Sequence, residues 1–317
     1  MLSVLLPIVL LTAGAALLTA GAEGFAENVS GASARLGVSV LALALLLAGA
    51  EPEEAVTAML AAGQGHPALA AGDAIGANLV ILTLTLGLAG LVTRLPVTRR
   101  SLEYGAAAAV LGAVAWLFLL NGVLGRLEGF VLVLLYVVGV VWVWRRERRP
   151  PVIGEMAELD AVDAAAVSEE ATGRALLLVL LGLLGMVAGG ALAVRGAEGL
   201  VGVLGIGESV IGLTVLALAT SAEMVALVWA ARRRGLTDVV VAGTVGAVAY
   251  NATVSLGLAG LVNPLGLGRH NAIIWVAGVT AVLPLVLFAG RRGVLPRVVA
   301  VLLVLGYVAV TGWLFVG

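Results

Sequence analysis

The chain has 317 residues, of which 62% are hydrophobic and 12% are charged, and its formal net charge is −1. A soluble globular domain has roughly 25% charged residues, so this composition excludes that class, and no nucleic-acid partner is expected. The chain contains no cysteine, which excludes disulfides, iron–sulfur clusters and thiolate zinc sites. It has only two histidines and no HExxH motif, which argues against an intramembrane zinc protease, and no resident cofactor is predicted.

Apolar runs long enough to cross a bilayer recur along the whole chain, which predicts an all-α polytopic membrane protein surrounded by lipid. The first and sixth runs exceed the roughly 20 residues that a bilayer requires, so both are expected to tilt. We predict ten transmembrane helices, at residues 2–31, 36–62, 69–93, 104–123, 129–145, 174–201, 206–231, 238–262, 271–290 and 296–315.

The arginines indicate how the chain is oriented. If the N-terminus lies outside, almost all of them fall in inner loops or at inner helix ends, and the outer loops hold only Arg126 and Arg269. Because positive charge is retained on the cytoplasmic side, both termini are expected outside, with the protein in the inner (plasma) membrane of the cell. The polar segment 146–173 is then a cytoplasmic linker.

A helix break with three carboxylates follows the second apolar run. Residues 49–54 read Gly-Ala-Glu-Pro-Glu-Glu. An ionised carboxylate in hydrocarbon is costly and therefore a functional candidate, and a proline frees backbone carbonyls that only protein or a water-filled cavity can cover. Consecutive helix positions point in different directions, so Glu51, Glu53 and Glu54 are not all expected to face one cavity.

The chain matches itself at an offset of 170 residues. The break at 49–54 falls on residues 219–224, and the seven residues 86–92 are identical to 256–262. This offset pairs Glu53 with Glu223, so that each half of the chain contributes one carboxylate.

The repeat predicts how the spans are organised. Each half holds five predicted spans, an odd number, so the second half enters the membrane from the opposite side. The expected architecture is two inverted five-helix repeats, 1–145 and 174–317, joined by the linker 146–173. In such folds the substrate lies near the membrane midplane where the repeats meet, which is where Glu53 and Glu223 are expected.

These segments resemble the signatures of the calcium/cation antiporter superfamily, which includes sodium–calcium and proton–calcium exchangers. In that family the first repeat runs roughly G-T-S-x-P-E, then G-N-P-x-x-A-x-G, then G-S-N-x-x-N. The resemblance covers about residues 21–92 and 196–262. Its motifs here are Gly49–Glu54, Gly65–Gly72 and Gly76–Ile81 in the first half, and Ile211–Glu223 and Gly246–Asn251 in the second.

The chain departs from the family pattern at several positions. Glu54 takes the usual first-repeat glutamate position, but Met224 takes that of its partner. Glu53 and Glu223 lie one residue earlier, where proton-coupled members carry glutamate. Oxygen-bearing side chains on which sodium sites of the family depend are thinned, which weakens the expectation of sodium coupling: Ala50 and Glu51 replace Thr-Ser, Ala77 and Ala247 replace serines, and Ile81 replaces the distal Asn.

The resemblance implies a cation cage at the two helix breaks. We predict Glu53 and Glu223 as the metal ligands, with Glu23, Glu198 and Glu51 as candidates for the ion path. Ca²⁺ binds six to eight oxygens in irregular geometry, which suits carboxylates completed by amide, hydroxyl and carbonyl oxygens. The other predicted cation-binding side chains are Glu54, Asn78, Asn251, Thr220 and Ser221.

The predicted function is secondary antiport of Ca²⁺ or another divalent cation against protons, by alternating access. When the cation leaves, desolvation and mutual repulsion favour protonation of at least one carboxylate, so metal and protons compete for the same oxygens. Two alternatives stay open: a sodium–calcium exchanger with reduced sodium sites, and a passive cation channel or non-transporting membrane scaffold. An enzyme is not expected, because no nucleophile–base constellation is present.

Overall fold

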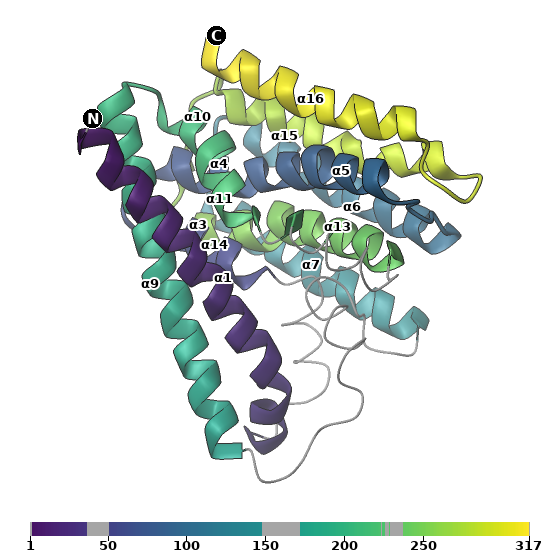
Figure 1. Ribbon diagram of the computed structural model, residues 1–317, viewed down its shortest axis with the longest axis horizontal. Helices are drawn as coiled ribbons and strands as arrows, with labels where there is room; N and C mark the ends of the chain where they lie inside the picture. Colours follow the sequence, from purple (N-terminus) through teal and green to yellow (C-terminus); the bar gives the residue numbers. More distant parts are fainter. Residues whose placement is uncertain are drawn as a thin grey trace.

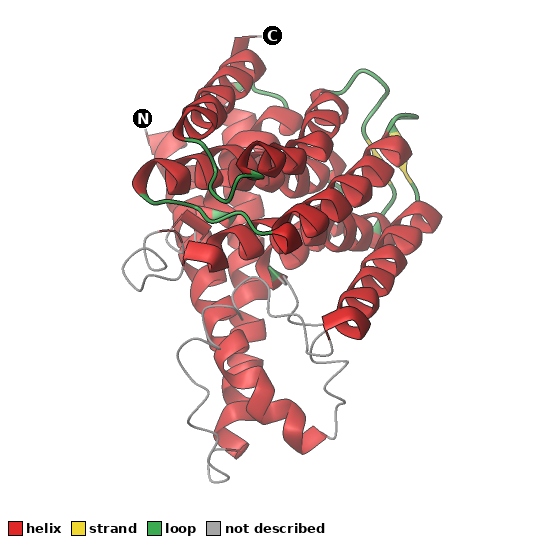
Figure 2. Cartoon of the chain, turned by 90° about the vertical axis from the view of Figure 1, so that its right-hand side faces the viewer, coloured by secondary structure: helices red, strands yellow, loops and turns green. Residues whose placement is uncertain are grey.

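The computed structural model describes residues 2–36, 51–147, 172–222, 224–225, 228 and 237–316, and these form an almost entirely helical protein (Figure 1). Figure 2 shows that strand is confined to one short pair in the loops. The helices are α1 (Leu2–Leu36), α3 (Pro52–Gly63), α4 (Pro67–Leu79), η1 (Val80–Thr85), α5 (Leu86–Val92), α6 (Arg99–Leu119), α7 (Arg126–Glu147), α9 (Thr172–Leu204), α10 (Glu208–Ile211), η3 (Gly212–Leu216), α11 (Ala217–Thr220), α13 (Thr237–Tyr250), η4 (Asn251–Ser255), α14 (Leu256–Val262), α15 (Ala272–Val282), η5 (Leu283–Gly290) and α16 (Arg297–Val316).

Within the described residues, 8 helical stretches are long and apolar enough to cross a membrane. They correspond to eight of the ten predicted spans, and the protein is an integral membrane protein. The other two predicted spans lie only partly in the described residues: 36–62 contributes α3, and 206–231 contributes the shorter apolar helix Glu208–Thr220. The linker 146–173 falls almost wholly outside the described residues, since α7 ends at Glu147 and α9 begins at Thr172.

Two continuous helical stretches form the centre of the molecule. In Pro67–Val92 (α4, η1 and α5) and in Val240–Val262 (most of α13, then η4 and α14), 78% of the most apolar window is buried by other parts of the chain. The remaining membrane-crossing stretches bury between 17% and 44%, because they present a face to lipid. Each central stretch contains a π-helical turn followed by the same seven residues, so the repeat in sequence is also a repeat in local structure.

The long helices α1 and α9 lie side by side along one edge of the molecule (Figure 1). Their backbones approach so closely that an ideal Cβ at Gly14 would lie 2.5 Å from the backbone nitrogen of Ala193, and one at Gly189 would lie 2.6 Å from that of Leu18. Small residues permit such contacts between membrane helices. Helices α1 and α9 therefore form one closely packed pair.

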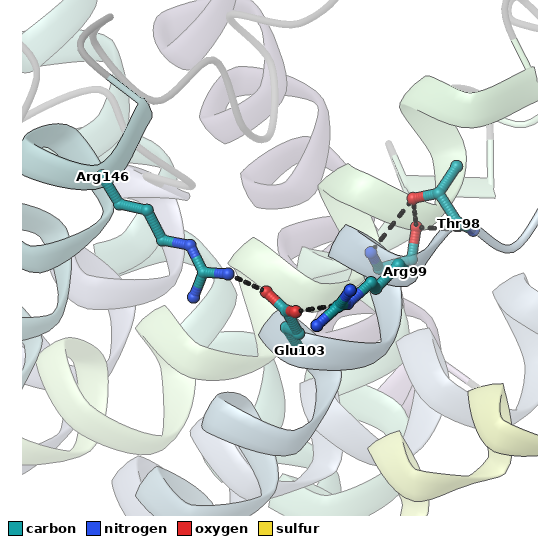
Figure 3. Close-up of polar contacts among 5 residues, drawn as sticks. Thr98, Arg99, Glu103 and Arg146 are labelled. Atoms are coloured by element: carbon teal, nitrogen blue, oxygen red, sulfur yellow. Dashed lines mark hydrogen bonds and ion pairs between the residues drawn. The ribbon is translucent and has the colours of Figure 1, made fainter.

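At the end of the molecule away from the chain termini, a carboxylate joins α6 to α7. Glu103 accepts a hydrogen bond from Arg99 Nε at 3.1 Å and another from Arg146 Nη2 at 2.5 Å (Figure 3). The N-terminus of α6 is closed by a capping box in which Thr98 and Ser101 exchange hydrogen bonds between side chain and backbone. Here α6 and α7 are held together by exposed polar groups.

Short backbone pairings connect loops of the two halves. Strand β1 (Val123–Leu124) pairs antiparallel with β2 (Leu265–Gly266), and an isolated bridge joins Pro96 to Val294. These contacts link the loop after α6 to the loop after α14, and the loop after α5 to the one before α16. The two halves are thus joined by loops as well as by the central helices.

Candidate cation site

The acidic break of the first half begins α3. Glu51 is the N-cap residue, and Pro52 follows at the first helical position, where a missing N–H leaves no hydrogen bond unmade. Glu53 and Glu54 lie in the first turn, where a negative charge is favoured by the helix dipole. All three glutamates are at most 2% exposed. The sequence therefore places three carboxylates at a buried helix start.

In the second half, a helix ends at the corresponding place. Helix α10 continues through the π-helical turn η3 into α11, which ends at Thr220 with Ser221 as its C-cap. Thr220 and Ser221 are 2% and 1% exposed. Two consecutive hydroxyl side chains are therefore buried at this helix end.

Three carboxylates of the first half accept hydrogen bonds from polar side chains of the second half. Ser221 Oγ donates to Glu54 Oε1 at 2.9 Å, and Thr220 Oγ1 donates to Asp73 Oδ1 at 3.1 Å. Asn251 Nδ2 donates to Glu51 Oε2 at 3.0 Å. The partners are between 147 and 200 residues apart in the chain. In these three contacts the first half supplies the carboxylate, and the second half supplies the hydroxyl or amide group that donates to it.

A close helix crossing brings Asp73 to Thr220. An ideal Cβ at Gly72 would lie 2.9 Å from the Cα of Gly212, and one at Gly76 would lie 2.6 Å from the carbonyl oxygen of Leu213. Because neither glycine carries a Cβ, α4 can lie directly against η3. Asp73 follows Gly72, so its side chain starts beside the helix that ends at Thr220.

Two asparagines complete the polar centre. Asn251 uses both ends of its amide, because Oδ1 accepts from Ser255 Oγ at 3.1 Å while Nδ2 donates to Glu51. Asn78 Nδ2 donates to the backbone carbonyl of Val248 at 3.2 Å. Its Oδ1 is buried and has no hydrogen-bond partner among the described residues. Asn78 therefore offers an oxygen at the boundary between α4 and α13.

The centre is rich in negative charge. The buried polar side chains of the described residues include four carboxylates (Glu51, Glu53, Glu54 and Asp73) but no arginine or histidine. Glu54 lies close enough to both Asp73 and Glu51 for the charges to interact. Buried charges require compensation by a counter-charge or by a proton. An inorganic cation surrounded by oxygen ligands would supply it.

The oxygens that face no partner fit a hard cation. Glu54 Oε2 and Asp73 Oδ2 are buried and have no hydrogen-bond partner among the described residues, while the second oxygen of each carboxylate is held by Ser221 or Thr220. In the described part of the chain no three Asp, Glu or His side chains converge as ligands of one metal ion. Neutral oxygens would therefore have to complete the coordination shell, as they commonly do for Ca²⁺.

Comparison with known proteins decides the family. The profile of the family described as "Sodium/calcium exchanger protein" matches residues 6–145 and 174–316. The chain belongs to this exchanger family. It is a family of transporters.

Relatives of this exchanger match over most of their length. CaxA of Alkalimonas amylolytica, described as a candidate antiporter, is 26% identical over 90% of each chain. The inner membrane protein YrbG of Escherichia coli is 27% identical over 85% of this chain and 84% of its own. The sodium–calcium exchanger NCX_Mj, in a structure soaked with Na⁺ and Sr²⁺, aligns over 96% of this chain and 97% of its own, with a TM-score of 0.62 and 20% identity. This last likeness establishes the shared fold.

The exchanger brings most of the predicted cation-binding residues together. The predicted ligands that its structure describes are all buried, at 2% exposure or less: Glu53, Glu54, Asn78, Thr220, Ser221 and Asn251. Glu223, predicted as a metal ligand, lies outside the described residues. Glu51 and Glu54 are three positions apart and so lie on one face of the helix start, and both reach the second half. Glu53 lies close to Tyr250.

Two candidates for the ion path lie away from this centre. Glu23 is exposed on α1. The side chain of Glu198 on α9 is 54% exposed, and its carboxylate lies 3.7 Å from His66 Nε2. The other ring nitrogen of His66, Nδ1, lies 2.8 Å from Glu208 Oε1. His66 thus connects the loop before α4 to both α9 and α10, outside the buried carboxylate group.

Asp73 was missed by the sequence analysis, although the structure buries it fully in the same group. Its repeat counterpart at the 170-residue offset is Gly243, so the comparison of the two halves gave no signal. A different rule would have found it: Asp73 is the one charged residue in the apolar stretch 67–92 of this exchanger, and an intramembrane carboxylate is a functional candidate by default.

Proposed function

We propose that this exchanger is a secondary antiporter that moves Ca²⁺, or another divalent cation, against protons by alternating access. The cation binds among the buried carboxylates of the first half and the hydroxyl and amide groups of the second half. The site includes Glu54, Thr220, Ser221, Asn78 and Asn251, together with Glu53 and Glu223 as predicted from the repeat. Protons occupy the same carboxylates when the cation leaves.

One observation carries this proposal: Glu54, Asp73 and Glu51 each accept a hydrogen bond from a side chain of the opposite half. A site divided in this way changes when the halves move relative to one another. Movement of the α1 and α9 pair against the remaining helices would open the site alternately to the two sides. The close glycine contacts within the pair allow it to move as one unit.

The proposed architecture is two inverted five-helix repeats, 1–145 and 174–317, with both termini outside and 146–173 in the cytoplasm. The repeated order of helix, π-helical turn and Leu-Gly-Leu-Ala-Gly-Leu-Val in α4–α5 and α13–α14 supports a common origin of the halves. The chain ends lie toward the same side of the molecule (Figure 1), in keeping with this orientation.

Protons are favoured over sodium as the coupling ion because side chains without oxygen occupy several family ligand positions. Ala77, Ile81 and Ala247 are each 0% exposed and pack with Met224 in one apolar cluster. Such a cluster supplies no oxygen to a sodium ion, whereas protons require only the carboxylates. A sodium–calcium exchanger with fewer sodium sites is the alternative within the same class.

Transport in liposomes tests this function. Purified protein is reconstituted, and uptake of radioactive Ca²⁺ is measured with either an outward proton gradient without Na⁺, or an outward Na⁺ gradient with pH clamped on both sides. Uptake driven by the proton gradient is expected. Uptake driven only by Na⁺ would overturn proton coupling. Flux that needs no counter-ion gradient would indicate a channel, and absence of any flux would indicate a scaffold.

Substitution of the carboxylates tests the site. Glu54→Gln and Glu223→Gln are each expected to reduce Ca²⁺ uptake by at least about tenfold, because each removes a negative charge from a site with low dielectric. Glu53→Gln tests the remaining predicted ligand in the same way. Glu128→Gln, which removes a carboxylate at the start of α7 outside the site, is the matched control and should retain uptake. Wild-type uptake in the first two variants would remove those residues from the site.

A further inference from the structure

Asp73 lies in the middle of α4 and is 0% exposed. Its Oδ1 accepts the hydrogen bond from Thr220 Oγ1 at 3.1 Å. Its Oδ2 is buried without a hydrogen-bond partner among the described residues. One carboxylate oxygen of Asp73 is therefore held in place by a residue of the second half of the chain. The other oxygen is buried and available to a ligand.

Glu54 has the same arrangement. Its Oε1 accepts from Ser221 at 2.9 Å, and its Oε2 is buried without a partner among the described residues. Thr220 and Ser221 are consecutive, so one helix end holds both carboxylates. The two groups are near enough for their charges to interact, and no buried arginine or histidine in the described part of the chain neutralises them.

We infer that Asp73 is a cation ligand that acts with Glu54, and that its charge determines the preference of this exchanger for divalent over monovalent cations. This inference rests on the proposed exchange function. Each added carboxylate favours a divalent over a monovalent cation, because the doubly charged ion is attracted more strongly at the same distance. The unpartnered oxygens of Asp73 and Glu54, with the hydroxyls beside them, supply the hard ligands that Ca²⁺ or Mn²⁺ prefers.

The position that corresponds to Glu54 in the second repeat is Met224. Met224 is 3% exposed and packs against Ala77 and Ala247 in an apolar cluster, so that position supplies no oxygen. Asp73 lies on α4, which contacts α11, and it brings a charge to Thr220 from the first half. The structure thus adds a charge beside Glu54 by a route that the repeat does not encode.

A purely structural role for Asp73 makes a different prediction. The hydrogen bond to Thr220 needs only an acceptor oxygen, and an asparagine side chain of the same shape retains one. Asp73→Asn therefore keeps the contact and removes the charge. This substitution therefore distinguishes two roles of Asp73: a hydrogen-bond acceptor that holds α11 against α4, and a charged ligand of a cation.

The test is cation binding to purified Asp73→Asn in detergent, measured by the increase of the thermal midpoint with added Ca²⁺, Mn²⁺ or Na⁺. We expect the half-saturating concentration of Ca²⁺ and of Mn²⁺ to rise at least tenfold, with less than a threefold change for Na⁺, and with the midpoint of the cation-free protein unchanged. Glu128→Gln is the control and should match the wild type for all three ions. Wild-type affinity for Ca²⁺ in Asp73→Asn would overturn the inference.

A second measurement uses the unmodified chain and does not depend on the folding of a variant. A hydrophobic carbodiimide adds to buried carboxyl groups, and peptide mass spectrometry locates the adduct at Asp73. Ca²⁺ is expected to suppress the adduct at Asp73 and at Glu54 over the same concentration range. Equal labelling of Asp73 with and without saturating Ca²⁺ would overturn the inference. If the wild type neither binds nor exchanges Ca²⁺, the proposed function fails as well; if it does both and only Asp73 is indifferent, the inference alone fails.

Discussion

Ser221, at the end of α11, donates a hydrogen bond to Glu54 at the start of α3 over 2.9 Å, although the two residues are 167 positions apart in the chain. Both side chains are 1% exposed. The contact lies where a helix of one half ends and a helix of the other begins. It joins a charged group to a hydroxyl across the boundary that the proposed transport cycle would have to open.

Ser221→Ala tests the energetic contribution of this contact. Hydrogen bonds to charged groups contribute about 1.5–3 kcal/mol, and a buried partner left without one is penalised. We expect the half-saturating Ca²⁺ concentration for uptake to rise about tenfold, because Glu54 loses the donor that orients it. Thr311→Val, which removes a hydroxyl that donates to backbone carbonyls of its own helix α16, should leave that concentration unchanged. Equal effects of the two substitutions would argue against a role of Ser221 in the site.

The pair Glu51–Asn251 is suited to a double-mutant cycle. Glu51→Ala, Asn251→Ala and the double variant are compared by thermal midpoint and by Ca²⁺ uptake. Since Asn251 Nδ2 donates to Glu51 Oε2 at 3.0 Å in a buried setting, the substitutions should be non-additive, with a coupling free energy of about 1 kcal/mol or more. Additive losses would show that the two side chains act independently.

The glycine contacts between α1 and α9 predict a position-dependent effect within one helix. A Cβ at Gly189 would lie 2.6 Å from the backbone nitrogen of Leu18, whereas a Cβ at Gly202, also on α9, meets nothing within 4 Å. We expect Gly189→Ala to destabilise the protein by about 1–3 kcal/mol, as overpacking does. Gly202→Ala should be neutral or stabilising by up to about 1 kcal/mol, because alanine favours helix. The thermal midpoints of the two variants in detergent test this prediction. Equal midpoints for Gly189→Ala and Gly202→Ala would contradict it.

The ion pair between Arg146 and Glu103 is expected to contribute little to stability or to transport. The two side chains are 46% and 27% exposed, and exposed pairs contribute about 0–1 kcal/mol because water and salt screen them. Arg146 also lies 5.3 Å from the ring centre of Trp142, which adds a second weak contact. Arg146→Ala should keep Ca²⁺ uptake within about twofold of the wild type. A loss of uptake comparable to that of Glu54→Gln would assign this end of α6 and α7 a role in transport.

The positions of the helices were largely predictable, because each depends on a continuous apolar run that must satisfy its own backbone in lipid. The sixth predicted span at 174–201 and α9 (Thr172–Leu204) differ by only a few residues. The start of α3 at Pro52 was also visible, since a proline has no backbone N–H to donate and is favoured at the first position of a helix. Thr220, Ser221 and Asn251 were predicted from the resemblance of the second half to the family signatures, which likewise depends on the sequence alone.

The pairing of the polar groups could not be predicted in the same way. Which glutamate meets which hydroxyl depends on how α3, α4 and α11 cross, and that is determined by contacts between residues far apart in the chain. Gly72 and Gly212 illustrate the difficulty, because each glycine alone could be a packing position against any neighbour. Only their mutual approach, with a Cβ at Gly72 falling 2.9 Å from the Cα of Gly212, brings Asp73 to Thr220.

By itself, the sequence determined that this protein lies in a membrane, where most of its helices run, and that two segments of the chain repeat one another. Hydropathy is a local property of the sequence, and a repeat is visible when the sequence is shifted along itself. The tertiary structure decided that Glu51, Glu54 and Asp73 all reach the second half, and that Asp73 is buried in the same polar group as Glu54. The physical reason is that side-chain hydrogen bonds form over about 3 Å, a distance that helix packing sets and that no pattern along the chain encodes.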